Sequence, residues 1–222
     1  MRFVVERSGH EDYGTIVQDG FLITKRKPEF AMIAWDALVI DEHICRDIDK
    51  TADLLDSKNV RAHHSQFDFY QSSESVKLVC DEACNTVEEY VSVWNSGKWD
   101  IKLVEGWGIR YSTGDSTRKH SHFPHTWSFV YMVEGCRKCS PLELYSQPDE
   151  SLKKIIDYKA ARRTIQFEPG KLLVFPGWIT HEVKEHQCKH PRYAVAGNIS
   201  QIYAKPSGKI INVDGYISGN NR

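Results

Sequence analysis

The stretch GKLLVFPGWITHEV, residues 170–183, decides the fold. Its apolar part, residues 172–176, ends at a Pro-Gly pair, and an uninterrupted apolar run of this length is typical of a strand buried on both faces. A lone histidine, His181, follows the run. The stretch therefore predicts a strand in the middle of a sheet, with an imidazole placed just beyond it.

On both sides of this stretch the chain continues as short runs that are rich in β-branched and aromatic residues and are broken by Gly, Pro or Asp. The runs are IKLVEGWGIRYST, WSFVYMVEG, PLELYS, RRTIQFEPG, KLLVFPG, HEVKEH, RYAVAGNISQIYA and KIINV. Many short strands separated by turn residues predict a sandwich or barrel. We place this β-rich core at residues 100–213.

The first part of the chain, residues 1–99, is mixed. FVVER, TIVQDGFLITKRK and FAMIAWDALVI are predicted to be extended, with a hairpin at Asp19-Gly20. Residues 74–95 have apolar side chains at three- and four-residue steps, which predicts an amphipathic helix that braces one face of the sheet. The insertion at 149–161 is predicted to be a short helix or an ordered loop. We therefore expect a single domain, residues 1–222, that is mainly β with flanking α.

Composition restricts the function. The chain has 222 residues, 41% of them hydrophobic, which is enough for a sizeable core. A net charge of -1 without a basic stripe makes nucleic acid an unlikely partner. No apolar run reaches the length of a membrane span and the amino terminus does not read as a signal peptide, so we expect no membrane partner and a soluble, cytoplasmic protein. The sequence leaves undecided whether the protein forms a homodimer.

The six cysteines are expected to be reduced, because a core of this size needs no disulfides. Cys136 and Cys139 form a single CxxC, which alone is a weak zinc signal. Cys188 lies between two histidines, so a zinc site that includes it is conceivable, and the role of the CxxC stays open.

Histidines form the strongest chemical pattern. The segment GDSTRKHSHFP, residues 114–124, places His120 and His122 two positions apart, where the side chains of a strand share one face. With His181 from a neighbouring strand they would form a mononuclear metal site, since imidazole suits iron, zinc, copper and nickel. His125 offers an alternative, in which His122 and His125 are the pair and His120 supports them.

These residues carry a family resemblance. The segment HSHFPHTWSFVYMV resembles the first metal motif of the 2-oxoglutarate- and iron(II)-dependent oxygenases, and more narrowly of those found in marine bacteria and their phages. CSPLELYS resembles the strand that comes next, and FEPGKLLVFPGWITHEV resembles the strand that leads to the distal histidine. HPRYAVAGNI resembles the strand whose basic residue binds the far carboxylate of the cosubstrate. The resemblance covers roughly residues 59–203.

The resemblance implies a double-stranded β-helix, or jelly roll, that uses Fe(II), 2-oxoglutarate and O₂. It implies His120, His122 and His181 as metal ligands and Arg192 as the cosubstrate-binding cation, with Tyr111 and Tyr131 able to donate a hydroxyl to the same carboxylate or to pack in the core. A phage-encoded member would act in the cytoplasm of a host. The sequence departs from the family pattern at His122, where an acidic residue is common, so the identity of the metal stays open.

We therefore expect a 2-oxoglutarate-dependent dioxygenase, a hydroxylase that couples decarboxylation to succinate with oxidation of a small-molecule or peptidyl substrate. Two alternatives stay open. One is a cupin-like dioxygenase with three histidines, which needs no arginine for a keto acid. The other is a jelly roll that binds a partner without catalysis.

Overall fold

The computed structural model describes most of the chain, including both candidate metal-binding segments. The described residues are 2–6, 14–18, 21–25, 37–51, 58–94, 99–145, 162–204 and 210–212. The predicted helix or loop at 149–161 lies outside them.

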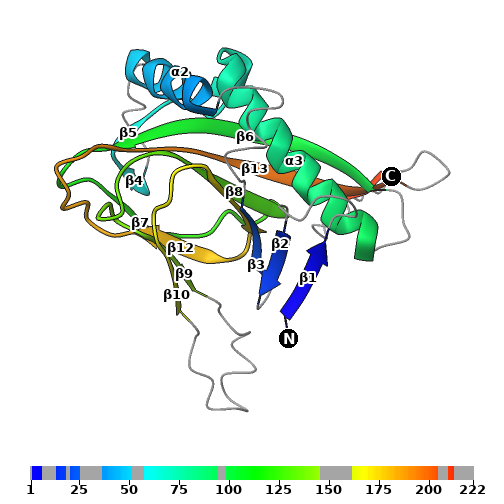
Figure 1. Ribbon diagram of the computed structural model, residues 1–222. Helices are drawn as coiled ribbons and strands as arrows, with labels where there is room; N and C mark the ends of the chain where they lie inside the picture. Colours follow the sequence, from blue (N-terminus) through cyan, green and yellow to red (C-terminus); the bar gives the residue numbers. More distant parts are fainter. Residues whose placement is uncertain are drawn as a thin grey trace.

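Two antiparallel sheets form the body of the molecule (Figure 1). The larger sheet has the order β1 (Arg2–Glu6), β2 (Gly14–Gln18), β3 (Phe21–Lys25), β11 (Lys171–Pro176), β8 (Trp127–Glu134), β13 (Arg192–Ala204), β6 (Trp99–Tyr111) and β5 (His63–His64), and β14 (Ile210–Asn212) pairs with β13. The smaller sheet has the order β10 (Arg162–Ile165), β9 (Leu142–Tyr145), β12 (Thr180–Val183), β7 (Ser116–His120) and β4 (Val60–Arg61). Most neighbours in these sheets are distant in sequence, and the chain crosses repeatedly between the two layers, as in the predicted jelly roll.

Apolar side chains from both sheets fill the space between them. Members of this interior cluster include Ile109 of β6, Leu144 of β9, Phe175 of β11 and Val183 of β12. In β11 the residues between Lys171 and Pro176 are all buried. Alternate side chains of a strand point to opposite faces, so burial of the whole run confirms the predicted strand with two covered faces.

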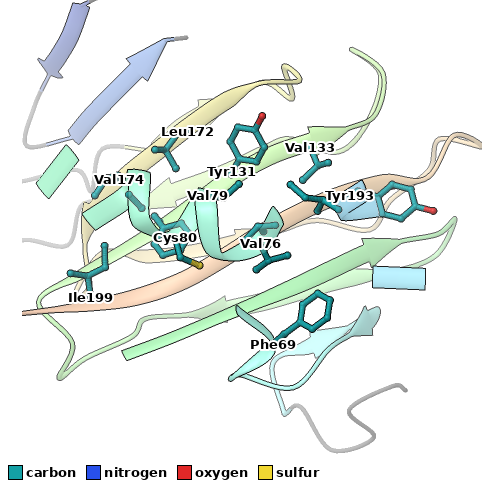
Figure 2. Close-up of a cluster of buried hydrophobic side chains, with 14 of the residues drawn as sticks. Phe69, Val76, Val79, Cys80, Tyr131, Val133, Leu172, Val174, Tyr193 and Ile199 are labelled. Atoms are coloured by element: carbon teal, nitrogen blue, oxygen red, sulfur yellow. The ribbon is translucent and has the colours of Figure 1, made fainter. Parts of the chain in front are cut away.

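The opposite face of the larger sheet is covered by helices (Figure 1). Helix α3 (Glu74–Trp94) lies across β6, β8, β11 and β13, and α2 (Ala37–Lys50) lies beside it, with the short helix η1 (Phe69–Gln71) leading into α3. Figure 2 shows the cluster beneath them, in which Val76, Val79 and Cys80 of α3 face strand residues such as Leu172 and Ile199. The three- and four-residue spacing in the sequence thus correctly predicted both the helix and its buried face.

Two glycines of β6 let the helices approach the sheet closely. A Cβ at Gly106 would come within 2.6 Å of the sulfur of Cys80, and a Cβ at Gly108 would come within 2.4 Å of Ile48 in α2. These distances are far below van der Waals contact, so glycine is required here for packing.

One prediction in the first part of the chain is confirmed and one is wrong. Strands β2 and β3 pair with Gln18 opposite Phe21, which is the predicted hairpin at Asp19-Gly20. Residues 37–40 were predicted to be extended, but they form the first turn of α2. A short apolar run does not distinguish strand from helix, and the burial of Ile44 and Ile48 against the sheet decides for the helix. The single-domain boundaries stay a prediction. No helix in the described part of the chain is long and apolar enough to cross a membrane.

Candidate metal centre and active site

Three histidines meet at one point between the sheets. His120 ends β7 and lies directly opposite His181 of β12 in the antiparallel register, so both rings extend from the same face. His122 follows in the loop after β7. One nitrogen of each ring lies within 4.8 Å of the other two, and the Nε2 atoms of His122 and His181 are 3.2 Å apart. Two nitrogens that are each about 2.0–2.1 Å from one ion lie roughly 3 Å apart, so this spacing fits a shared metal.

Backbone carbonyls hold two of these imidazoles in the tautomer that a metal needs. Nδ1–H of His120 donates to the carbonyl of Arg118 at 2.7 Å, and Nδ1–H of His181 donates to the carbonyl of Ile179 at 3.1 Å. Because the proton is on Nδ1 in both rings, Nε2 keeps its lone pair. Carbonyl partners of this kind orient ligand histidines in metal sites.

The surroundings keep the three rings neutral. Burial, together with the neighbouring imidazoles, lowers the pKa of His122 to about 2. Burial lowers the pKa of His181 to about 3, and it also lowers the pKa of His120. The imidazoles are therefore unprotonated at neutral pH, which is the form that binds a metal.

The loop that carries His122 is held by the turn before β12. The N–H of His122 donates to the carbonyl of Gly177 at 2.8 Å, and the N–H of Gly177 donates to the carbonyl of Thr126 at 2.9 Å. A Cβ at Gly177 would lie 2.0 Å from the carbonyl oxygen of His125. Only glycine permits this backbone approach, so Gly177 contributes to the placement of His122.

The alternative ligand, His125, lies outside the histidine cluster. Its Nε2 is 4.0 Å from a carboxylate oxygen of Glu105, and it lines the approach to the site. Among the described residues the structure brings together the first-choice ligands, His120, His122 and His181.

Arg192 lies in the same cavity as the three histidines. The hollow measures about 490 Å³ together with its opening to solvent, and it is lined by both the histidines and Arg192. The guanidinium carbon of Arg192 lies 4.7 Å from the ring centre of Tyr111 and 4.9 Å from that of Phe167. Arg192 is only 1% exposed, and its Nε and Nη2 have no hydrogen-bond partner among the described residues. Burial lowers the pKa of this guanidinium, as expected for a cation without a carboxylate beside it.

The two predicted tyrosines lie on opposite faces of the larger sheet. Tyr111 pairs with Arg192 across β6 and β13, lines the cavity, and shares a hydrogen bond of 2.6 Å with the hydroxyl of Thr117. Tyr131 belongs to the cluster beneath α3 (Figure 2). The suggestion that Tyr131 reaches the cosubstrate is therefore corrected to its alternative, core packing, because its position along β8 points it away from the interior.

An outer pocket adjoins the metal-binding residues. It shares Trp107, His120 and His122 with the inner cavity, and its rim carries Phe67 and Phe123, which are 41% and 69% exposed. Large exposed aromatic side chains around a pocket are typical of a binding surface.

Two residues of this pocket wall are not marked by the sequence patterns described above. His64 is 1% exposed and stacks on Trp107 with ring centres 5.7 Å apart. The indole N–H of Trp107 has no partner among the described residues. Pairing of β5 with β6 brings these two rings together, and no local pattern encodes that pairing.

Comparison with known proteins shows which family the site-bearing part of the chain is similar to. Residues 105–198, which include the three histidines and Arg192, match the family model described as "Putative 2OG-Fe(II) oxygenase". Over these residues the chain is similar to the 2OG-Fe(II) oxygenases. No curated protein matches the chain.

Solved structures support the fold. One is the epimerase SnoN of nogalamycin biosynthesis, a non-haem α-ketoglutarate-dependent enzyme, with a TM-score of 0.61, 10% identity, and coverage of 92% of this chain and 87% of SnoN. A prolyl-4-hydroxylase from Pseudomonas putida has a TM-score of 0.53 and 14% identity over 74% of this chain and 85% of that one. HygX from Streptomyces hygroscopicus, solved with nickel and 2-oxoglutarate, has a TM-score of 0.54 and 11% identity over 81% and 82%.

The matched family uses Fe(II), 2-oxoglutarate and O₂. The residues present fit them: three neutral imidazoles face one point, and imidazole is a good ligand for iron. The departure noted in the sequence remains, since the cluster contains no carboxylate.

Proposed function

We propose that this protein is a 2-oxoglutarate- and Fe(II)-dependent hydroxylase, in which His120, His122 and His181 hold the iron and Arg192 binds 2-oxoglutarate. The observation that carries the proposal is a single cavity lined by three neutral imidazoles and by a buried guanidinium without a carboxylate partner. When bound, the iron would supply the activation of O₂ that couples decarboxylation of 2-oxoglutarate to succinate with oxidation of the substrate.

Arg192 would bind the carboxylate of 2-oxoglutarate that is distant from the metal. A guanidinium presents two parallel N–H donors to a carboxylate, and the free Nε and Nη2 of Arg192 are such a pair. A buried cation without a counter-ion destabilises the fold, and an anionic ligand removes this cost. The hydroxyl of Tyr111, which now bonds to Thr117, is available as a further donor in the same part of the cavity.

Charge explains how the site can work without a carboxylate ligand. Three neutral imidazoles leave the two positive charges of Fe(II) uncompensated, and Arg192 adds another. The two carboxylates of 2-oxoglutarate offset two of these three charges. We therefore infer that the cosubstrate contributes more to metal retention here than in a site with an acidic ligand.

The outer pocket would bind the primary substrate. Trp107, Phe67 and Phe123 offer apolar contacts, while the carboxylate of Glu105 accepts a hydrogen bond from the amide of Asn198 at 2.7 Å. These groups suit a substrate that presents an apolar carbon toward His120 and His122 and a hydrogen-bond donor toward Glu105. Either a small molecule or a peptide side chain has this character.

A second candidate is a dioxygenase that uses the three-histidine centre without 2-oxoglutarate, as in cupin-like enzymes. The absence of a carboxylate from the histidine cluster favours it. Arg192 argues against it, because such an enzyme has no use for a buried cation next to the metal ligands.

Anaerobic titration with Fe(II), with and without 2-oxoglutarate, tests the proposal. We expect a weak visible charge-transfer band only when both are present, and succinate production once O₂ and a substrate are supplied. Iron binding with no response to 2-oxoglutarate would instead support the second candidate.

Ligand variants test the metal centre separately. His120→Ala, His122→Ala and His181→Ala should each remove most of the iron affinity, and His125→Ala is the matched control that should retain it. Iron is counted by anaerobic titration on protein whose circular dichroism is unchanged. Full iron affinity in His120→Ala, with loss in His125→Ala, would make His125 the ligand instead.

A further inference from the structure

A second cluster of metal-binding side chains lies away from the histidines. Cys136 and Cys139 come from the loop after β8, and Cys188 comes from the loop that leads into β13. The sulfur of Cys136 is 3.4 Å from that of Cys188 and 3.7 Å from that of Cys139, and all three lie within 4.8 Å of one another. The sequence showed only one CxxC, and the fold supplies the third thiol.

The spacing of the sulfurs suits a tetrahedral ion. Sulfurs bound to zinc at about 2.3 Å lie roughly 3.7 Å apart around a tetrahedron. A disulfide requires about 2.05 Å between two sulfurs and leaves the third thiol without a role. The observed arrangement is therefore closer to a shared ion than to a bonded pair.

Local structure around the CxxC favours the thiolate of Cys136. The N–H of Cys139 donates to the carbonyl of Cys136 at 2.9 Å, which closes a turn, and the N–H of Cys136 donates to the sulfur of Cys139 at 3.2 Å. Hydrogen bonds from Cys188 and from the backbone of Lys138 lower the pKa of Cys136. Burial raises the pKa of Cys139 to about 11, so an ion would displace a proton from this thiol.

Basic residues flank the three cysteines in the sequence. Three thiolates and one divalent ion carry a net charge of −1, and the exposed Arg137, Lys138 and Lys189 are adjacent to the cysteines in sequence. Half-burial of Cys136 and Cys188 leaves the fourth corner of the tetrahedron to a small ligand from solvent.

We propose that Cys136, Cys139 and Cys188 bind one Zn²⁺ ion. The ion joins the loop after β8 to the loop before β13. These loops already share hydrogen bonds, from the hydroxyl of Ser140 to the carbonyl of Glu185 at 3.1 Å and from the N–H of Ser140 to Nδ1 of His186 at 3.4 Å. The ion would thus link two loops at the end of the barrel where β13 begins.

The proposed zinc site is connected to Arg192 through one packed side chain. Zinc binding there does not depend on whether Arg192 binds 2-oxoglutarate. Cys139 packs with Met132 and Phe167, and the ring of Phe167 contacts the guanidinium of Arg192. Cys188 is four residues before Arg192 in the chain. Zinc would therefore stabilise the segment that delivers this arginine to the cavity.

Metal analysis of reduced full-length protein tests the proposal. To exclude the histidine centre, the double variant His120→Ala/His181→Ala is loaded with Zn²⁺ and dialysed. We expect one tightly bound equivalent of zinc, which Cys139→Ser should abolish and the control Cys84→Ser should leave in place, because Cys84 is a half-buried thiol on α3 outside the cluster. With Co²⁺, the intense near-ultraviolet band of thiolate ligation should follow the same pattern.

A measurement on the unmodified chain keeps the test independent of variant folding. Zinc should protect Cys136, Cys139 and Cys188 from alkylation, measured peptide by peptide, and a chelator should restore their reactivity. Absence of zinc uptake and of protection in the reduced protein would overturn the proposal. A disulfide between Cys136 and Cys188 in air, with no metal uptake after its reduction, would instead identify a redox pair.

Discussion

The two faces of the larger sheet are built from the same strands but have opposite chemistry. On β13, Tyr193, Val195 and Ile199 join the apolar cluster beneath the helices, while Arg192 and Ala196 line the cavity. The helix-covered face is packed with apolar side chains, and its arginine, Arg110, pairs with Asp49, whereas the interior face buries Arg192 with Nε and Nη2 unpaired among the described residues. An unsatisfied buried polar group costs about 1–3 kcal/mol, so the interior face gives up stability that only a ligand recovers.

Truncation on the helix-covered face should affect stability alone. Leu172→Ala removes a buried side chain of β11 that faces α3, and we expect a loss of about 2–5 kcal/mol in the free energy of unfolding. Urea denaturation measures the loss, and 2-oxoglutarate affinity of the folded protein should be unchanged. Phe175→Leu is the counterpart on the other face of the strand, and since its ring contacts His181 it should weaken metal binding as well. Weakened metal binding in Leu172→Ala would show that the two faces are coupled.

Replacing the buried cation Arg192 should not lower the free energy of unfolding, in contrast to Leu172→Ala. Arg192→Met should lower 2-oxoglutarate affinity by about 1.5–3 kcal/mol, the value of hydrogen bonds to a charged group. The ligand-free protein should unfold at an equal or higher urea concentration, because an unpaired buried charge has been removed. Calorimetric titration and urea denaturation measure the two effects, and Arg192→Lys separates the loss of charge from the loss of paired donors. Unchanged affinity in Arg192→Met would remove this residue from the site.

A smaller effect than that of Arg192→Met is expected at Gly177, whose backbone lies close to the backbone of His125 near the metal ligands. Gly177→Ala must displace the carbonyl of His125 and the loop that carries His122. We expect about tenfold weaker iron binding, or roughly 1.4 kcal/mol, by analogy with changes that misorient a ligand. Gly170→Ala is the contrasting control, because it strains a turn with a positive φ of 80° but meets no neighbouring atom. Equal iron affinity in both variants would indicate that the loop adjusts freely.

Removal of single hydroxyls gives the smallest contrast between the faces. Tyr111→Phe should weaken 2-oxoglutarate binding by about 1 kcal/mol, the net value of one hydrogen bond. Tyr131→Phe should leave that binding unchanged, because Tyr131 lies beneath α3. KM for 2-oxoglutarate reports both variants, and an equal effect of the two would contradict the assignment of faces.

Strong local patterns were enough to predict much of the fold. The helix at Glu74–Trp94, the β2–β3 hairpin and the doubly buried strand β11 followed from side-chain periodicity and turn residues, which act over a few positions. The turn of helix at residues 37–40 was missed, because its apolar residues suit a strand equally well and only packing against β6 decides between them.

The candidate site, like the fold, could be predicted from the sequence only in part. His120, His122 and His181 were predicted from the spacing of the first two along a strand and from the metal chemistry of imidazole, and Arg192 was predicted from the family resemblance. Which of them meet was decided by the pairing of β7 with β12, which places His120 opposite His181 and leaves His125 outside. The stacking of His64 on Trp107 and the addition of Cys188 to the CxxC join segments more than forty residues apart. The helices, the strands and the chemical character of each residue follow from near neighbours in the chain and could be predicted locally. Which residues share a site depends on strand register, which acts across the whole chain and is known only from the folded protein.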